Sequence, residues 1–198
     1  GTVSAMRYGG IQNVRNGGTG TISTMSAGLQ YIHSGGTGTV STMMSGGYMN
    51  ISSGGAGVVS TMSGGEQNIY SGGTGIVSTM SGGLQSLASG GTGTVSTMSG
   101  GLQNVSSGGA VTLGVMNGGY QTLAGGTGTI STMSSGTQTV SSGGTGIIGT
   151  FINGRQNVTE GSGTISTMSG GTQNIYSGAT GTVSAMRYGG IQNVRNGG

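Results

Sequence analysis

Short stretches of alternating apolar and polar residues recur along the whole chain, separated by pairs of glycine. A typical unit reads GTVSTMSGGLQNVSSGG at 93–109, and close copies begin near residues 75, 128 and 163. Each unit holds two stretches of β-prone residues, such as TVSTM and LQNVS, and Gly-Gly pairs allow the positive φ angles of tight corners. The pattern predicts two or three short strands in each unit.

The repeat unit is 17 to 19 residues long, and ten units fill residues 1–180. Residues 181–198 repeat residues 1–18 letter for letter. Eighteen residues are too few for two packed helices but suffice for one coil of a β-solenoid, in which equivalent positions stack about 4.8 Å apart. We therefore predict an all-β parallel β-helix with about 18 residues per coil and 10–11 coils. Residues 1–198 form one segment, which we expect to belong to a longer array.

Three columns of equivalent positions are apolar in every unit, which predicts that they form the core. Two of these columns are aliphatic and begin at Val3 and Val14. The third is a ladder of methionines with one phenylalanine, formed by Met6, Met25, Met43, Met62, Met80, Met98, Met116, Met133, Phe151, Met168 and Met186.

A glutamine stands two residues before the second aliphatic position in all units but one, so both side chains face the same side of a strand. We predict that these glutamines point inward and form a ladder of amide hydrogen bonds. Met49, a near-isostere, occupies the remaining unit. The alternative is a row of ligand-binding amides. The ladder comprises Gln12, Gln30, Gln67, Gln85, Gln103, Gln121, Gln138, Gln156, Gln173 and Gln192.

The position before each methionine is mostly threonine, with Ala5, Val115 and Ala185 as substitutes, so it is also expected to face inward or to be half-buried. A bend near Thr24 and Met25, and at the equivalent positions, would bring both columns toward the core.

The net charge is best counted without residues 181–198, because these repeat residues 1–18. The first 180 residues hold three arginines and two glutamates, a net charge of +1, which excludes a nucleic-acid footprint.

Chemistry-bearing residues are scarce, because the chain has one histidine and no cysteine, aspartate or lysine. Glu66 and Glu160 lie five units apart, about 24 Å in a solenoid, whereas a glycosidase pair needs at most about 9.5 Å. We predict that the chain is not an enzyme and uses no cofactor or metal. The methionine spacing and Phe151 fit a hydrophobic ladder better than a copper site. No apolar run reaches the roughly 18 residues of a membrane span.

Variable residues alternate with the inward glutamine and aliphatic positions, so they share one outer sheet face. This face is the candidate site for self-association or ligand binding, and the alternative is a solvated surface without constraint. A second face carries repeated Thr-Gly-Thr and resembles that of β-helical antifreeze proteins, which leaves ice binding open. The candidate residues are Tyr31, His33, Tyr48, Tyr70, Tyr120, Arg155 and Tyr176.

The phrase GG-x-Q-x-V/I-x-S-GG-T resembles the passenger repeats of AIDA and antigen 43 type self-associating autotransporter adhesins. GGLQSLASGGT at 82–92 and GGLQNVSSGGA at 100–110 match it best. The resemblance implies a right-handed β-helix on a bacterial cell surface that mediates adhesion, aggregation and biofilm formation. Its expected partner is a second copy, with cell-surface glycans as the alternative partner of a ligand-binding rod. The resemblance also implies O-glycosylation on serine or threonine.

Overall fold

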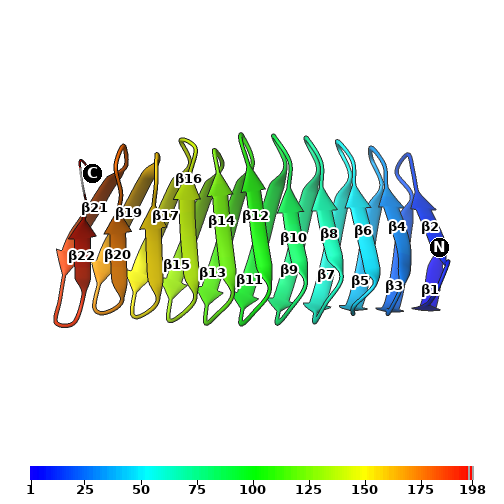
Figure 1. Cartoon of the computed structure of the whole chain (residues 1–198). Helices are drawn as coiled ribbons and strands as arrows, with labels where there is room; N and C mark the ends of the chain where they lie inside the picture. The colour runs from blue at the N-terminus through cyan, green and yellow to red at the C-terminus, as the bar shows by residue number, and fades with distance from the viewer. Residues whose placement is uncertain (196, 198) are drawn as a thin grey trace.

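The computed structural model describes residues 1–195 and 197, and strands are the only regular secondary structure in that part of the chain. The strands form two parallel sheets of eleven strands each. Every repeat unit contributes one strand to each sheet, so the units stack as coils in a single row from the N-terminus to the C-terminus (Figure 1). The predicted parallel β-solenoid with about 18 residues per coil is confirmed.

The odd-numbered strands form the first sheet, called sheet A here, and the even-numbered strands form the second, sheet B. Sheet A consists of β1 (Thr2–Met6), β3 (Thr19–Met25), β5 (Thr37–Met43), β7 (Ala56–Met62), β9 (Thr74–Met80), β11 (Thr92–Met98), β13 (Ala110–Met116), β15 (Thr127–Met133), β17 (Thr145–Phe151), β19 (Ser162–Met168) and β21 (Thr180–Met186). Sheet B consists of β2 (Ile11–Val14), β4 (Gly28–Ile32), β6 (Gly47–Ile51), β8 (Glu66–Ile69), β10 (Leu84–Leu87), β12 (Leu102–Ser106), β14 (Tyr120–Ala124), β16 (Thr137–Ser141), β18 (Arg155–Val158), β20 (Thr172–Ile175) and β22 (Ile191–Val194).

Equivalent positions of successive units stand directly over one another in both sheets. In sheet A, Val95 pairs with Val77 on one side and with Leu113 on the other. In sheet B, Gln103 pairs with Gln85 and with Gln121. Each column of the sequence repeat is therefore a physical row along the solenoid axis, with steps of about 4.8 Å.

The core lies between the two sheets and is built from the three apolar columns. From Ile22 to Ile165 in sheet A, and from Ile32 to Ile175 in sheet B, the aliphatic side chains are fully buried. The methionine column and Phe151 are buried as well, with Met6 at 4% exposure, whereas Met186 in the last coil is 48% exposed. Burial of each apolar side chain requires a neighbouring coil, so the core is stabilised by stacking.

The threonine column before the methionines lies outside this core and is half-buried in most coils, which is one of the two positions that the sequence predicted. In β5, both Ser41 and Thr42 face outward, and the inward alternation resumes at Met43. Ser41 also has no partner in the register with β3 and β7. The bend therefore lies at Ser41 and Thr42, next to the methionine, close to where the sequence predicts it. It lets the methionine enter the core without the threonine, which stays half-buried in Thr42 and exposed in Thr61.

Sheet A also contributes an inward-facing glycine in nearly every coil, at the position two before the aliphatic residue. A Cβ atom added to Gly38 would lie only 2.7 Å from both Gln30 Oε1 and Ile32 Cγ1. The sheets approach closely at this end of the core, so any larger residue has to displace the side chains opposite it. Val111 is the exception, and it is buried in the one coil that accepts a side chain there.

The structure places the glutamine column inside the solenoid, with every member from Gln30 to Gln173 fully buried. In Gln30, and in every member from Gln85 to Gln192, the Nε2 atom donates to the Oε1 atom of the glutamine one coil toward the N-terminus, at 2.6 to 2.8 Å. Gln67 donates to the sulfur of Met49 instead. Several also donate to a glycine carbonyl of sheet A, as Gln173 does to Gly163 at 3.1 Å. Gln12 and Gln192, in the first and last coils, are only half-buried.

Candidate functional site

The outer face of sheet B carries the variable residues that the sequence singles out, in three rows that run along the solenoid. The first row occupies the first or second position of each sheet B strand and includes Tyr48, Tyr120 and Arg155. The middle row is mostly asparagine and includes Tyr31, and the third row follows the last inward aliphatic residue and includes Tyr70. The candidate residues thus share a face but fall into separate groups along it.

Tyr31, His33, Tyr48 and Tyr70 lie together on three successive coils near the N-terminal end. Tyr31 is paired with Asn50 of the next coil, and Tyr48 stands two residues before Asn50 on the same face. Tyr31 and Tyr48 are therefore diagonal neighbours, within the reach of aromatic side chains. Tyr48 is 38% exposed and Tyr70 is 50% exposed, so this group presents flat aromatic surface to solvent.

His33 follows the end of β4 and is half-buried, whereas Tyr48 and Tyr70 are exposed. Its Nε2 atom is buried and has no hydrogen-bond partner within the described residues. The backbone N–H of His33 donates to the carbonyl of Val14 at 2.8 Å, which continues the ladder between coils. The half-buried side chain therefore makes no hydrogen bond through Nε2 within the described residues.

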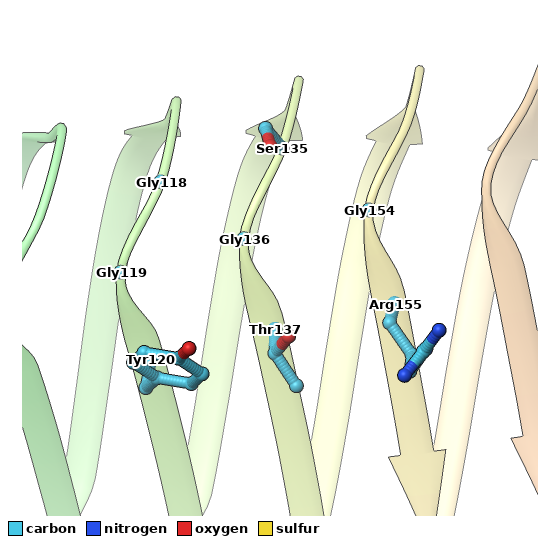
Figure 2. A pocket seen from close by; sticks show the side chains of 8 residues that line it. All are labelled: Gly118, Gly119, Tyr120, Ser135, Gly136, Thr137, Gly154 and Arg155. Atoms are coloured by element: carbon cyan, nitrogen blue, oxygen red, sulfur yellow. The ribbon is translucent and has the colours of Figure 1, made fainter.

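A second group lies three coils further along, where Tyr120, Thr137 and Arg155 begin three successive strands of sheet B. Tyr120 pairs with Thr137, and Thr137 pairs with Arg155. Figure 2 shows these three side chains in line beneath the turns that lead into β14, β16 and β18. Together with the turn residues above them they line an open groove of about 410 Å³, formed by Gly118, Gly119, Tyr120, Ser135, Gly136, Thr137, Gly154 and Arg155.

Tyr176 stands apart from both groups, in the third row of coil ten. The guanidinium of Arg195 lies 5.7 Å from the centre of its ring, in cation–π range. Tyr176 is half-buried, so its ring face is already partly occupied by this contact.

The middle row contains a feature that the sequence reasoning missed. Outward asparagines also form hydrogen bonds between coils, with Asn68 donating to Asn50 at 3.2 Å and Asn174 donating to Asn157 at 2.9 Å. The sequence repeat could have indicated these hydrogen bonds, because asparagine often follows the glutamine directly. The outer face is therefore partly fixed by its own amide bonds wherever asparagines are consecutive.

The remaining chemistry of the molecule is sparse. The described side chains bring together no group of three or more His, Cys, Asp and Glu residues that could hold a metal ion. In the same part of the chain, no helix is long and apolar enough to span a membrane. The side chains of the candidate surface supply phenol, guanidinium, hydroxyl and amide groups.

Comparisons with known proteins identify a solved structure with a similar fold. No protein-family model and no curated protein matches the chain. Among solved structures, it is similar to a TibA fragment, residues 55–350, hyperglycosylated in a reaction catalysed by TibC, at 29% identity and a TM-score of 0.59. The match covers 98% of this chain and 90% of that one. TibA is an autotransporter adhesin of the AIDA family, and this chain shares the AIDA-type passenger fold.

Proposed function

We propose that this chain is part of an extracellular adhesin of a bacterial cell surface, in which the solenoid serves as a self-associating rod. The observation that carries the proposal is the similarity to the TibA fragment over almost the whole chain. A stacked solenoid suits this role because its rows repeat one surface along its length, so that many weak contacts add up between two rods.

The tyrosine group around Tyr31, Tyr48 and Tyr70 is the proposed contact surface. Tyrosine is enriched at protein interfaces because it supplies a large, rigid apolar surface and a hydroxyl group that bonds at its edge. The face carries a single carboxylate close to this group, that of Glu66, so that a second copy meets little electrostatic repulsion. Biofilm formation and cell aggregation follow from contacts of this kind between rods on different cells.

The role is structural, and we infer that the chain has no enzymatic activity of its own. We also infer that exposed hydroxyl groups are acceptors for O-glycosylation, since the similar TibA fragment is hyperglycosylated. Ser60, Ser78 and Ser96 form such an exposed row on sheet A. Sugar chains in this row would cover sheet A and leave the tyrosine face of sheet B free.

Sedimentation velocity of the purified chain from low to high micromolar concentration tests self-association. We expect the apparent mass to rise with concentration, and to stop rising when Tyr31, Tyr48 and Tyr70 are all replaced by serine. The control replaces Thr39, Thr94 and Thr129 on the outer face of sheet A by serine. Circular dichroism verifies that both variants keep the sheet. A concentration-independent monomer, or a tyrosine variant that associates like the parent, contradicts the proposal.

A further inference from the structure

We propose that the groove between Tyr120 and Arg155 binds a pyranose sugar that carries a carboxylate, such as a uronic or sialic acid residue. The proposal goes beyond self-association and does not rest on it, because the groove lies several coils away from the proposed contact surface. It rests on the spacing of three side chains, on the glycine-containing turns above them and on the positive charge of Arg155.

The spacing creates a slot one coil wide. Tyr120 and Arg155 stand two coils apart, about 9.6 Å between backbones, and the smaller Thr137 lies between them. Tyr120 is 62% exposed and Arg155 is exposed, whereas Thr137 is half-buried. The two long side chains therefore stand on either side of the smaller Thr137. In Figure 2 the ring of Tyr120 lies toward Thr137, whereas the guanidinium of Arg155 turns to the side away from it. A volume of about 410 Å³ is within the range of roughly 300–1,000 Å³ that is usual for small-molecule sites.

The upper part of the slot is lined by backbone, because the turns contain glycine where the chain reverses. Gly136 has a φ of 96°, and a Cβ there would lie 2.8 Å from Met116 Cε and 2.9 Å from the carbonyl oxygen of Gly119. This position can hold only glycine without strain. Because Gly118, Gly119, Gly136 and Gly154 carry no side chain, a ligand in the slot can approach the peptide groups of the turns.

The side chains supply the complementary chemistry. The ring of Tyr120 offers a flat face against which the C–H side of a pyranose can lie, at a small cost in conformational entropy. Thr137 and Ser135 place hydroxyl groups in and above the slot, where they can exchange hydrogen bonds with sugar hydroxyls. The planar guanidinium of Arg155 is suited to hold a carboxylate through two parallel hydrogen bonds.

The charge distribution favours an anionic group at this place. Glu160 lies in the turn at the far end of β18, five residues from Arg155 or about 16 Å along an extended chain. Glu66 lies five coils away, about 24 Å. Neither carboxylate can neutralise Arg155. Among the described coils, this is also the one place in the first row where a small residue is flanked by tyrosine and arginine: the row reads Ile11, Leu29, Tyr48, Glu66, Leu84, Leu102, Tyr120, Thr137, Arg155, Thr172 and Ile191.

Ligand-observed NMR and calorimetric titration with two acidic probes test the proposal. The probes are tetragalacturonic acid, which carries uronic acids, and 3′-sialyllactose, which carries a sialic acid, and lactose is the neutral control. We expect at least one acidic probe to bind with a Kd of about 1 mM or below, weakened by added salt, and lactose not to bind. The probe that binds identifies the source of the carboxylate.

Three variants locate the site. Arg155→Gln should weaken binding about tenfold, because the bidentate contact is lost, and Tyr120→Ser about fivefold, because the stacking surface is lost. Tyr176→Ser is the matched control, on the same face but outside both the groove and the proposed contact surface, and should bind like the parent. The proposal is overturned if neither acidic probe binds up to about 10 mM, if lactose binds as well as they do, or if Arg155→Gln binds like the parent.

Discussion

The side-chain amide of Gln67 donates a hydrogen bond to the sulfur of Met49 at 3.4 Å, at the one place where the internal glutamine ladder is interrupted. On the other side of Met49, the Oε1 atom of Gln30 is buried and has no hydrogen-bond partner among the described residues. A thioether is a weak acceptor and cannot donate. Met49 therefore fills the space of a glutamine but leaves one buried acceptor unsatisfied.

Met49→Gln should stabilise the solenoid, because the new amide can donate to Gln30 and accept from Gln67. We expect the free energy of unfolding to rise by about 1–2 kcal/mol, the usual cost of an unsatisfied buried polar group. Urea denaturation followed by circular dichroism measures the change.

The reverse substitution, Gln103→Met, is the matched experiment in an intact part of the ladder. It should lower the free energy of unfolding by about 1–3 kcal/mol, because Gln85 Oε1 then loses the donor that it now has at 2.7 Å. If both variants change stability in the same direction, the ladder is not the cause.

The close approach of the two sheets gives a second prediction. Gly38→Ala places a Cβ atom 2.7 Å from Gln30 Oε1 and should destabilise the fold by about 1–3 kcal/mol through overpacking. Gly93→Ala is the control, since its Cβ would meet Leu87 and Gln85 only at 3.0 and 3.1 Å. We expect a loss below about 1 kcal/mol there. Thermal and urea unfolding measure both variants, and equal losses would contradict this account of the inward glycines.

The fold could be predicted from the sequence because each column records one physical row of the solenoid. Gln103 and Val105 are two positions apart, so a period of two puts both on one side of the strand, and both are buried. The same reasoning could not decide between an inward and a half-buried position for Thr42, because the bend at Ser41 and Thr42 interrupts the period for one residue. The residue types do not reveal such a bend, since serine and threonine are tolerated both inside and outside a sheet.

The candidate site was less accessible to sequence reasoning than the fold. The alignment of equivalent positions identified Tyr120 and Arg155 as variable residues that face outward. It did not show that Thr137 between them forms a depression, because depth depends on the relative size of residues that are 17 or 18 positions apart. The turn glycines above the groove looked like ordinary corners, and their role as its lining depends on the backbone path.

The methionine ladder gives a third prediction. Met98 is fully buried between two coils, and Met98→Ala should lower the free energy of unfolding by about 2–5 kcal/mol, because the cavity is only partly closed by relaxation. Met98→Leu keeps most of the volume and should cost less than about 1.5 kcal/mol. Urea denaturation distinguishes the two. Similar losses for both variants would indicate that the thioether, rather than the packed volume, matters at this position.

Adjacent methionines provide the last prediction, on oxidation by hydrogen peroxide. Met43 is fully buried in the ladder, whereas Met44 follows the strand and is 41% exposed. Because peroxide must reach the sulfur atom, Met44 and the 48% exposed Met186 should form sulfoxides first. Met43 should stay reduced until the coils open.

Peptide mapping by mass spectrometry after graded exposure measures the order of oxidation. The variant Met44→Leu removes the most reactive site outside the last coil and should leave the rate at Met43 unchanged. Denaturation in urea is the control, since it should bring Met43 and Met44 to the same rate. Equal rates in the folded protein would mean that the coils around Met43 open readily, which the continuous ladders on both sides of β5 argue against.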